Sequence, residues 1–297
     1  MKLINPSVEL IAQTPSLEGI YKQVERVGRV CYKSEDKITE ESAKPFVERM
    51  VKSQHLAMLE HGTVYLAAPY NNEDLIFWKV ANSPYSKGVC DDKSNLLCLT
   101  TNLRVIAELN AWEVIDKYLC EPTESHAKRI CLKFITSIGI SREFNRHRTA
   151  SIAEQSTRYC NYTKDKFNNE LTFIKPSWLN IPTGHYAYWD GDWCDVNEMK
   201  IQLPGEEHKD IDAFLWTLED AEREYTLLIN KGWQPQQARE VLPLSTATEV
   251  VYTAFEDDWK HFFSLRYKGT TGLPHPNAQQ VASIAHDLII KELGKDL

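Results

Sequence analysis

The spacing of apolar residues predicts helices near the amino terminus and then a strand. Residues 14–30 carry apolar side chains at intervals of three and four, which is the spacing of one helix face. These side chains are Leu17, Ile20, Tyr21, Val24 and Val27. Thr14 is suited to cap this helix. Residues 40–53 repeat the pattern with Thr39 as the expected cap, and residues 63–67 follow as a strand-like run.

The middle of the chain is less regular. Residues 102–118 favour a helix, and residues 130–138 favour a strand that ends at Gly139 and enters a polar, arginine-rich segment. Residues 160–210 are rich in Asn, Pro, Gly, Trp and Tyr, a composition that is typical of loops packed by aromatic side chains.

The last third of the chain predicts helices. Apolar residues between 214 and 228 form one helix face, and Gly232 stands where that helix is expected to end. Pro235 is suited to begin the next helix. Two more helices are expected around residues 247–266 and 277–293.

The order of these elements indicates the fold class. Helices come first, then strands, loops and helices again, which differs from the regular strand–helix alternation of a doubly wound sheet. The sequence contains no G-x-G-x-x-G motif, so a Rossmann dinucleotide fold is not expected. We therefore expect an α+β, non-Rossmann fold with a helical C-terminal third.

Composition and charge narrow the classes of partner. The chain has 297 residues, of which 42% are hydrophobic and 26% charged, with a formal net charge of −8. An acidic surface repels nucleic-acid backbones, so a small anionic ligand would need a local group of arginines. No segment has the ~18 consecutive apolar residues of a membrane span, and the amino terminus lacks the apolar core of a secretory signal. We expect a cytoplasmic protein with no nucleic-acid or membrane partner.

The cysteines predict reduced thiols rather than a disulfide framework or a metal site. There are seven, an odd number, and no C-x-x-C pair occurs. No Pro-Cys dipeptide occurs either, so a Pro-Cys setting for a catalytic thiolate is missing from the sequence. We expect no catalytic cysteine and no metal.

The segment Ser141–Tyr162 (SREFNRHRTASIAEQSTRYCNY) carries the strongest functional signal. Within it, Arg142, Arg146, Arg148 and Arg158 are concentrated in an otherwise acidic chain. The forked guanidinium group of arginine can bind two phosphate oxygens at once, and serine hydroxyls complete such sites. The segment therefore predicts a pocket for phosphate or pyrophosphate. The alternative is a solvated, salt-bridged face, as most runs of charge are.

The same segment carries the first of four motifs that resemble one family. Arg146-His147-Arg148, seven residues and Ser156 reproduce the R-H-R-x7-S signature of the flavin-dependent thymidylate synthases. The other three matches, in the family's order, are H-x-x-x-x-E-H at residues 55–61, A-R-E-V-L-P-L at 238–244 and W-K-H-F-F-S-L-R at 259–266.

This resemblance implies a fold and an activity. The fold would be a mixed β-sheet core flanked by helices, in a single domain over residues 1–297 with enlarged segments near 67–129 and 165–210. The activity would be reductive methylation of dUMP to dTMP, with methylenetetrahydrofolate as the carbon donor and FAD, reduced by NADPH or NADH, as the hydride donor. The family's active sites form between subunits of a homotetramer, so a homotetramer is implied.

The resemblance also implies roles for individual residues. The expected FAD-binding residues are Ala57, Arg146, His147, Arg148, Glu154 and His261, and the stretch from His55 to Ala57 is expected to lie near the flavin. The expected dUMP-binding residues are Glu143, Arg146, Glu154, Gln155, Ser156, Thr157, Arg158, Arg239 and Arg266. Arg266 is also the expected catalytic residue, because a fixed cation beside uracil favours the N3-ionised base. Ser156 is expected to bind rather than to attack, since reduced flavin supplies the hydride directly.

Other readings of these residues remain open. Arg239 could form a structural ion pair, and Arg266 could bond backbone carbonyls at a helix end. His55 and His61 could be ordinary core or capping histidines.

The sequence also departs from the family pattern. Glu143 stands where many members have Gln, and Ala153 where the signature often has Asn. A family histidine that follows L-R could be replaced by His275 or Asn277. The departures at Glu143 and Ala153 leave open a related enzyme that transfers hydroxymethyl, and an inactive flavin- or nucleotide-binding homologue is the third possibility.

Overall fold

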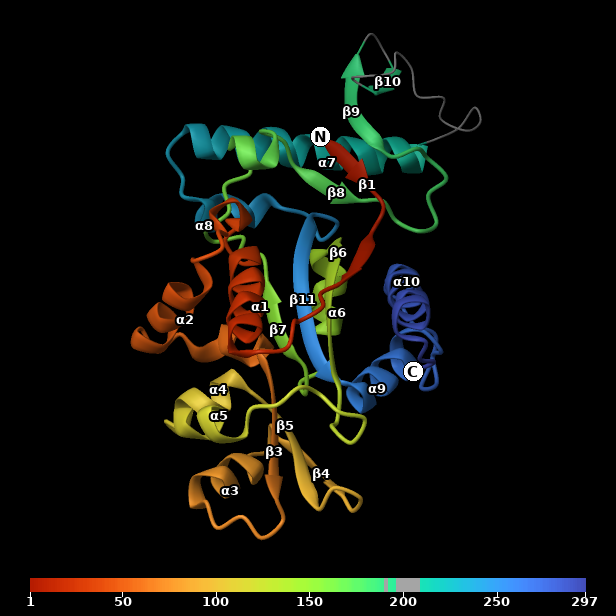
Figure 1. The fold of residues 1–297 in the computed structure, drawn as a ribbon. Helices are drawn as coiled ribbons and strands as arrows, with labels where there is room; N and C mark the ends of the chain where they lie inside the picture. Colours follow the sequence, from red (N-terminus) through yellow and green to blue (C-terminus); the bar gives the residue numbers. More distant parts are fainter. Residues whose placement is uncertain (190–191, 196–208) are drawn as a thin grey trace.

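The computed structural model describes residues 1–189, 192–195 and 209–297 (Figure 1). Its α-helices are α1 (Leu17–Val30), α2 (Ala43–Lys52), α3 (Leu75–Ala81), α4 (Leu103–Glu108), α5 (Trp112–Tyr118), α6 (Ile138–Phe144), α7 (Lys209–Asn230), α8 (Pro235–Ala238), α9 (Glu256–Arg266) and α10 (Pro276–Leu293). Its 3-10 helices are η1 (Glu35–Lys37), η2 (Leu56–His61), η3 (Asp165–Phe167) and η4 (Arg239–Val241). Its strands are β1 (Lys2–Ile4), β2 (Ser7–Leu10), β3 (Thr63–Pro69), β4 (Lys87–Asp91), β5 (Leu96–Asn102), β6 (Arg129–Ser137), β7 (Ser151–Glu154), β8 (Thr172–Ile174), β9 (Gly184–Trp189), β10 (Asp192–Asp195) and β11 (Ala247–Phe255).

An antiparallel sheet in the order β2-β6-β11-β7 forms the centre of the molecule. One face packs against α9 and α10 through a core that includes Phe134, Trp259 and Val281. The other face packs against α1, where Val27 meets Val251. Figure 1 shows α1 on one side of this sheet and α9 and α10 on the other. The sheet is thus covered on both faces. The arginine-rich segment leaves it at the end of β6.

The prediction of a helix around residues 247–266 was wrong over its first half. Residues 247–255 form β11, paired along its whole length with β6 from Ala247 opposite Ser137 to Phe255 opposite Arg129. Most of its side chains are buried on both faces, so the segment reads as a continuous apolar run without alternation. Its β-branched residues favour a strand, and only after Phe255 does the helix α9 begin.

The other predicted helices were found with shifted ends. α1 begins at Leu17, and its cap is Ser16 rather than Thr14, since the Ser16 hydroxyl accepts the Gly19 amide at 3.1 Å. α2 begins at Ala43 rather than after Thr39. The helix expected over 102–118 is split into α4 and α5, and its first residue, Asn102, does act as a cap. The strand expected over 130–138 is β6, which ends at Ser137, so Gly139 lies within α6.

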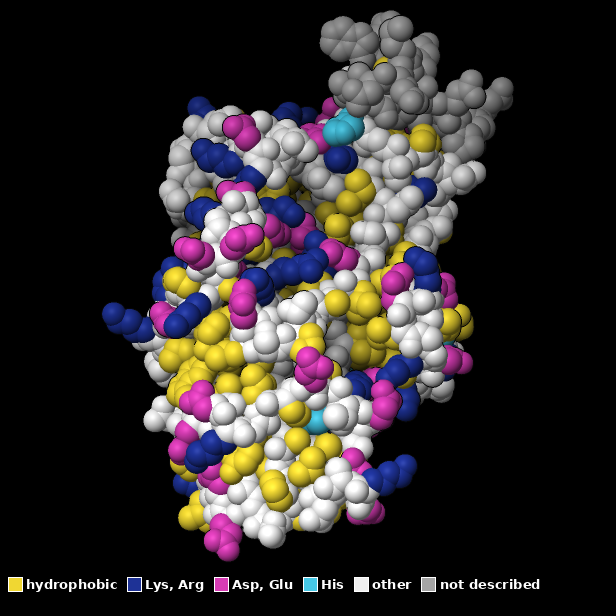
Figure 2. All heavy atoms as spheres, viewed as in Figure 1, with side chains coloured by type: hydrophobic (Ala, Val, Ile, Leu, Met, Phe, Trp, Pro, Cys, Tyr) yellow, Lys and Arg dark blue, Asp and Glu magenta, His cyan; other side chains and the backbone are white. Residues whose placement is uncertain are grey.

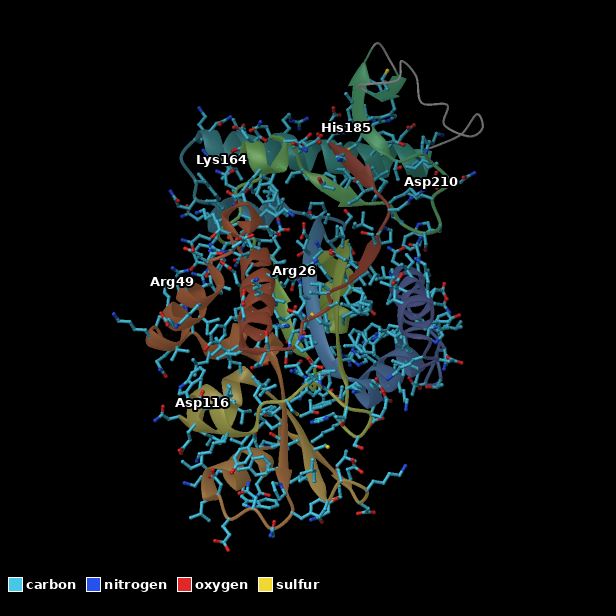
Figure 3. All side chains as sticks on the ribbon, in the orientation of Figure 1. Arg26, Arg49, Asp116, Lys164, His185 and Asp210 are labelled. Carbon is cyan, nitrogen blue, oxygen red and sulfur yellow. The ribbon has the colours of Figure 1, made fainter. Side chains whose placement is uncertain are left out.

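Two smaller sheets are separate from the central one. The antiparallel sheet β3-β5-β4 packs with α3, α4 and α5 and accounts for much of the enlarged segment at 67–129. The sheet β10-β9-β1-β8 packs against α7 and draws on the enlarged segment at 165–210, part of which lies outside the described residues. Figure 3 shows Asp116 on α5 and His185 on β9 toward opposite ends of the view.

The predicted α+β class is confirmed by this mixture of helices and sheets. Within the described residues, the parallel pairing of β1 with β8 belongs to the small sheet, while the central sheet is antiparallel throughout. The C-terminal third contains α7 to α10, with β11 between them. A single domain stays a prediction. In the described part of the chain, no helix has the length and apolarity needed to cross a bilayer.

Candidate functional site

The arginine-rich segment folds as a helix, a turn and a short strand at the end of β6. The hydroxyl of Ser137 accepts the Ile140 amide at 3.3 Å and so caps α6. After α6 the chain turns through residues 145–150 and enters β7, which pairs with β11. Consecutive helical residues point about 100° apart, so Arg142 and Glu143 line different clefts.

The first cleft, which we call the serine cleft, has a volume of about 520 Å³. It lies where the end of β7 meets η4, and it brings together residues that are more than 80 positions apart in sequence. A guanidinium nitrogen of Arg239 donates to the Thr157 hydroxyl at 3.2 Å, which joins the two motifs directly. The lining residues are Ile138, Arg142, Glu154, Gln155, Ser156, Thr157, Arg158, Arg239, Glu240, Leu242 and Leu244.

The serine cleft gathers most of the residues expected to bind dUMP, with three arginines and the hydroxyls of Ser156 and Thr157. Arg142 was noted within the arginine cluster but was not expected as a ligand residue, and the structure adds it to this wall. Such a set of forks and hydroxyls suits a phosphate dianion.

The second cleft, which we call the histidine cleft, has a volume of about 780 Å³ and lies on the other side of α6. It combines the remaining arginines of the segment with α9 and with the loop that follows α9. Its lining residues are Glu143, Arg146, His147, Arg148, Thr149, His261, Leu265, Arg266, Thr271, Gly272, Leu273, Pro274 and His275.

Arg266 is held in place by three hydrogen bonds to α6 and the turn after it. Its Nη1 donates to Glu143 Oε2 at 3.0 Å, its Nη2 to the Glu143 carbonyl at 2.8 Å, and its Nε to His147 Nε2 at 3.1 Å. The expected helix-end reading is partly met, because a backbone carbonyl is one partner, but that carbonyl belongs to α6 rather than to α9. Arg266 therefore fixes the position of Glu143 and His147 at the cleft wall.

His147 is neutral in this arrangement. Burial, together with the nearby charge of Arg266, lowers the pKa of His147 to about 4. Because Nε2 accepts the Arg266 proton, the imidazole proton resides on Nδ1. The positive charge of the histidine cleft thus comes from Arg146, Arg148 and Arg266, opposed by Glu143.

Four arginines of the segment are exposed without an acidic partner. Arg142, Arg146, Arg148 and Arg158 have no carboxylate within 4 Å among the described residues. Figure 2 shows basic and acidic side chains interleaved over the middle of the face that it draws. There, Arg26, labelled in Figure 3, lies 2.5 Å from Glu9. These four arginines therefore lack the ion pairs of a salt-bridged face, although Glu143 of the same segment is paired with Arg266.

Glu154 has a different setting from the arginines around it. Its Oε1 accepts the Ser141 hydroxyl at 2.7 Å and the Thr248 hydroxyl at 3.2 Å, and its Oε2 accepts Asn145 Nδ2 at 3.3 Å. The carboxylate therefore links α6, the following turn, β7 and β11. It lines the serine cleft, not the histidine cleft that holds the other expected flavin residues.

The expected flavin residues do not all meet within one chain. Ala57 and His55 line a third cleft of about 560 Å³ formed by α1, α2 and η2, and the three clefts share no lining residue among those described. His261 and His147 do meet, with ring centroids 5.9 Å apart. His61 is a core histidine: it is fully buried, and its Nδ1 lies 2.8 Å from the Thr253 hydroxyl.

The structure separates the two candidates for the family histidine. His275 lines the histidine cleft and caps α10, where its Nδ1 accepts the Asn277 amide at 3.2 Å. Asn277 is buried and bonds the Ser177 amide at 2.8 Å instead. Only His275 of the two therefore has access to a ligand in this cleft.

The cysteines near the serine cleft are poor nucleophiles. Cys160 is fully buried, and burial raises the pKa of its thiol. Burial also raises the pKa of Cys31 to about 11. A buried thiol with a raised pKa carries little thiolate at neutral pH.

Several residues of these clefts were not anticipated from the sequence. Leu242, Leu244 and Glu240 lie beside Arg239 in a motif that was recognised, so the motif itself was the available signal. Leu273 is completely exposed in the loop beyond α9 and lines the histidine cleft. Nothing in its sequence context marks it as a cleft residue.

Comparison with known proteins is consistent with this geometry. A family model described as thymidylate synthase complementing protein matches residues 103–291. A flavin-dependent thymidylate synthase of Haloarcula marismortui is 30% identical over 118 residues, which are 38% of this chain and 45% of that relative. The match thus spans less than half of the relative's length.

Two solved structures of the UMP/dUMP methylase PolB from Streptomyces cacaoi, bound with 5-Br dUMP and with 5-Br UMP, are similar to this chain at 18% identity. They align over 98% of this chain and over 93% and 92% of theirs, with a TM-score of 0.44. The family assignment depends on the sequence match rather than on this likeness. Because the matched region covers well over half of the chain and includes the arginine-rich segment, Arg239 and Arg266, the chain belongs to the thymidylate synthase complementing protein family, that of the flavin-dependent thymidylate synthases.

Proposed function

We propose that this protein is a flavin-dependent thymidylate synthase that methylates dUMP to dTMP. Methylenetetrahydrofolate would be the carbon donor, and FAD reduced by NADPH or NADH would be the hydride donor. The main support is the set of four exposed arginines without described acidic partners, which line two clefts on either side of α6 in a chain of net charge −8.

The serine cleft is the proposed site of the dUMP phosphate. Arg158 and Arg239 would bind the phosphate through their forks, with Ser156 and Thr157 donating hydroxyl protons. Arg142 lines the same wall and would add a third fork. Gln155 and Glu154 line the inner part of the cleft, where Glu154 is already engaged by protein donors. We propose that Glu154 holds the wall of the serine cleft in place, and that only the edge of its side chain contacts the bound dUMP.

The histidine cleft fits the charged part of FAD. Arg146 and Arg148 are exposed and unopposed at short range, and neutral His147 adds no charge of its own but can donate through Nδ1. When bound, FAD would supply the hydride that reduces the pyrimidine. The residues of this chain would hold its phosphates and exclude water from the reacting face.

We further propose that the complete site forms between subunits of a homotetramer. Ala57 and His55 lie in a cleft that shares no described lining residue with the histidine cleft, although both sets are expected to contact flavin. A symmetric oligomer can bring the third cleft of one subunit to the histidine cleft of another.

Two measurements test the proposed function. The purified full-length protein, mixed with FAD and freed of excess, should show the visible absorbance of bound flavin. It should then convert dUMP to dTMP when methylenetetrahydrofolate and NADPH are added, with the product identified by mass. A product heavier by one oxygen would instead favour the hydroxymethyl-transferring enzyme. Flavin binding without any product would favour the inactive homologue, and no flavin binding would overturn the proposal.

A further inference from the structure

A buried tyrosine of β11 connects the central sheet to the turn that follows α6. Tyr252 is only 1% exposed, and its ring packs edge-on against Phe134 and Phe144, with ring centroids 5.7 and 6.3 Å away. Its hydroxyl lies 2.5 Å from Asn145 Oδ1. None of the four sequence motifs includes Tyr252, and it lines neither the serine cleft nor the histidine cleft.

The direction of this hydrogen bond follows from the second partner of Asn145. The amide nitrogen of Asn145 donates to Glu154 Oε2 at 3.3 Å. An ionised carboxylate only accepts hydrogen bonds, so the amide nitrogen must face Glu154 and the amide oxygen must face Tyr252. Because that oxygen only accepts, the tyrosine hydroxyl is the donor. Burial raises the pKa of Tyr252, so the hydroxyl keeps its proton at neutral pH.

Asn145 occupies the position where the two clefts come closest in sequence. It directly precedes Arg146, which lines the histidine cleft, while its partner Glu154 lines the serine cleft. The side chain of Asn145 is itself exposed. An exposed asparagine ordinarily samples several rotamers, but the hydrogen bonds to β11 and β7 restrict this one.

The backbone alone holds Arg146 only weakly. The Arg146 amide lies 3.4 Å from the Glu143 carbonyl, which is long for a hydrogen bond. The residues on either side are held through their side chains instead. His147 is bonded by Arg266, and Asn145 is bonded by Tyr252. The position of Arg146 at the cleft wall therefore depends on these two side-chain contacts.

We propose that Tyr252 is a positioning residue for the flavin site. Its hydroxyl fixes Asn145, and Asn145 in turn sets where Arg146 presents its guanidinium to the phosphates of FAD. This inference rests on the proposed function, because it takes FAD to be the ligand of the histidine cleft. A fork that is already in place binds phosphate without first losing the freedom of the turn, so Tyr252 would raise FAD affinity without contacting FAD.

Two matched variants of the full-length protein test this role. Tyr252→Phe keeps the packed ring and removes only the hydroxyl. Tyr186→Phe on β9 removes the hydroxyl of another tyrosine that is 1% exposed, one that donates to the Pro182 carbonyl at 2.7 Å. Each variant loses one hydrogen bond, so each should lower the melting temperature by about 2–4 °C.

The two variants should differ in flavin binding. The dissociation constant of FAD, measured by flavin fluorescence titration, should rise about threefold to tenfold in Tyr252→Phe and by less than about 1.5-fold in Tyr186→Phe. Wild-type FAD affinity in folded Tyr252→Phe would overturn the proposal. An equal loss of affinity in both variants would do so as well, because any lost hydrogen bond would then have the same effect.

A double-mutant cycle tests the path through Asn145. In the Asn145→Ala protein the contact is already absent, so adding Tyr252→Phe should change FAD affinity by less than about twofold. If the effects of the two substitutions add in full, Tyr252 acts by another route and the proposal fails. If Tyr252→Phe does not fold, Asn145→Ala at its exposed position removes the same contact and should weaken FAD binding at least as much.

Hydrogen exchange of the flavin-free protein provides a measurement that does not depend on FAD. Tyr252→Phe should speed the exchange of the amides of residues 145–150 and leave those of β11 unchanged, whereas Tyr186→Phe should leave both unchanged. Unchanged exchange at residues 145–150 in Tyr252→Phe would overturn the proposed contact. A wild-type protein that binds no flavin would overturn the proposed function instead, and exchange would still decide whether Tyr252 holds the turn.

Discussion

At the scale of single residues, Arg158 and Arg266 have different surroundings. Arg158 is exposed at the serine cleft, with its guanidinium 5.4 Å from the Tyr159 ring centroid, whereas Arg266 is fixed by Glu143 and His147. A flexible exposed fork contributes to binding in the ground and transition states alike. A fixed cation stabilises charge that develops during reaction.

This contrast predicts different kinetic effects. Arg158→Ala should mainly raise KM for dUMP, and Arg266→Ala should lower kcat by roughly 10²-fold or more. Arg158→Lys should restore little, because an ammonium group does not reproduce the fork. Steady-state kinetics of the folded variants with FAD saturating would measure both effects. An Arg266→Ala enzyme with unchanged kcat would leave Arg266 only its role in holding α6.

Glu143 is the acidic group of the histidine cleft, and its charge should weaken anion binding there. Glu143→Gln keeps an oxygen for Arg266 but removes the negative charge. FAD should then bind about twofold to fivefold more tightly at low salt, with the gain shrinking at high ionic strength. Flavin fluorescence titration would measure this, with Glu113→Gln on α5 as a distant control. Weaker FAD binding by Glu143→Gln would show that the carboxylate contacts flavin favourably.

His61 predicts a specific loss of stability in acid. Its pKa is about 3 in the folded protein and 6.5 when unfolded, so between these values the unfolded chain binds a proton that the folded protein excludes. Stability therefore falls as pH drops below 6.5, by about 2 kcal/mol at pH 5. Urea unfolding at pH 7 and pH 5 should show a smaller difference in His61→Gln than in the wild type. An equal difference in the two proteins would mean that His61 titrates normally.

At the scale of elements, Glu154 connects two strands of the central sheet with α6. It accepts bonds from Ser141 of α6 and Thr248 of β11 while lying at the end of β7 itself. Hydrogen bonds to a charged group contribute more than neutral ones, so Glu154→Ala should lower the unfolding free energy by about 2 kcal/mol. Glu240→Ala, which removes an exposed carboxylate from the same cleft, should cost less than about 0.5 kcal/mol. Denaturant unfolding of both variants checks this, and equal losses would contradict a structural role for Glu154.

The elements also show what the sequence could and could not predict. α10 was predicted closely, and the end of α7 was too, because the helix period stops near Gly232, which has a φ of +92° just after the last helical residue, Asn230. β11 was missed because a strand buried on both faces loses its alternation, and nothing local separates it from a helix. β7 was missed because a four-residue strand in a polar segment has almost no pattern of its own.

The candidate site was predictable to a similar extent. The motifs identified the walls of the serine and histidine clefts because their spacing is distinctive. The motifs could not indicate that α6 would divide Arg142 from Glu143, or that Arg266 would be engaged by Glu143 and His147. The first feature required knowing that residues 138–144 form a helix, and the second depends on contacts between α6 and α9, which are more than 110 residues apart in sequence.

At the scale of the whole molecule, the separation of Ala57 from the histidine cleft predicts complementation between subunits. Ala57→Trp would block the third cleft, and a double change of Arg146→Ala and Arg148→Ala would disable the histidine cleft, so each variant alone should be inactive. Co-expressed, they should recover about a quarter of wild-type activity, since one in four shared sites would combine two intact halves. Activity assays of the co-purified mixture, with separately purified variants mixed after folding as the control, would test this. A mixture as inactive as its parts would place the whole site within one subunit.

The position of α6 as a common wall has a thermodynamic consequence. Arg142 faces one cleft and Glu143 the other, and the helix between them is only seven residues long. A ligand that shifts or steadies α6 from one side must therefore alter the affinity on the other side. Linkage requires that influence to be reciprocal. If bound nucleotide changes the affinity for flavin by some factor, bound flavin must change the affinity for nucleotide by the same factor.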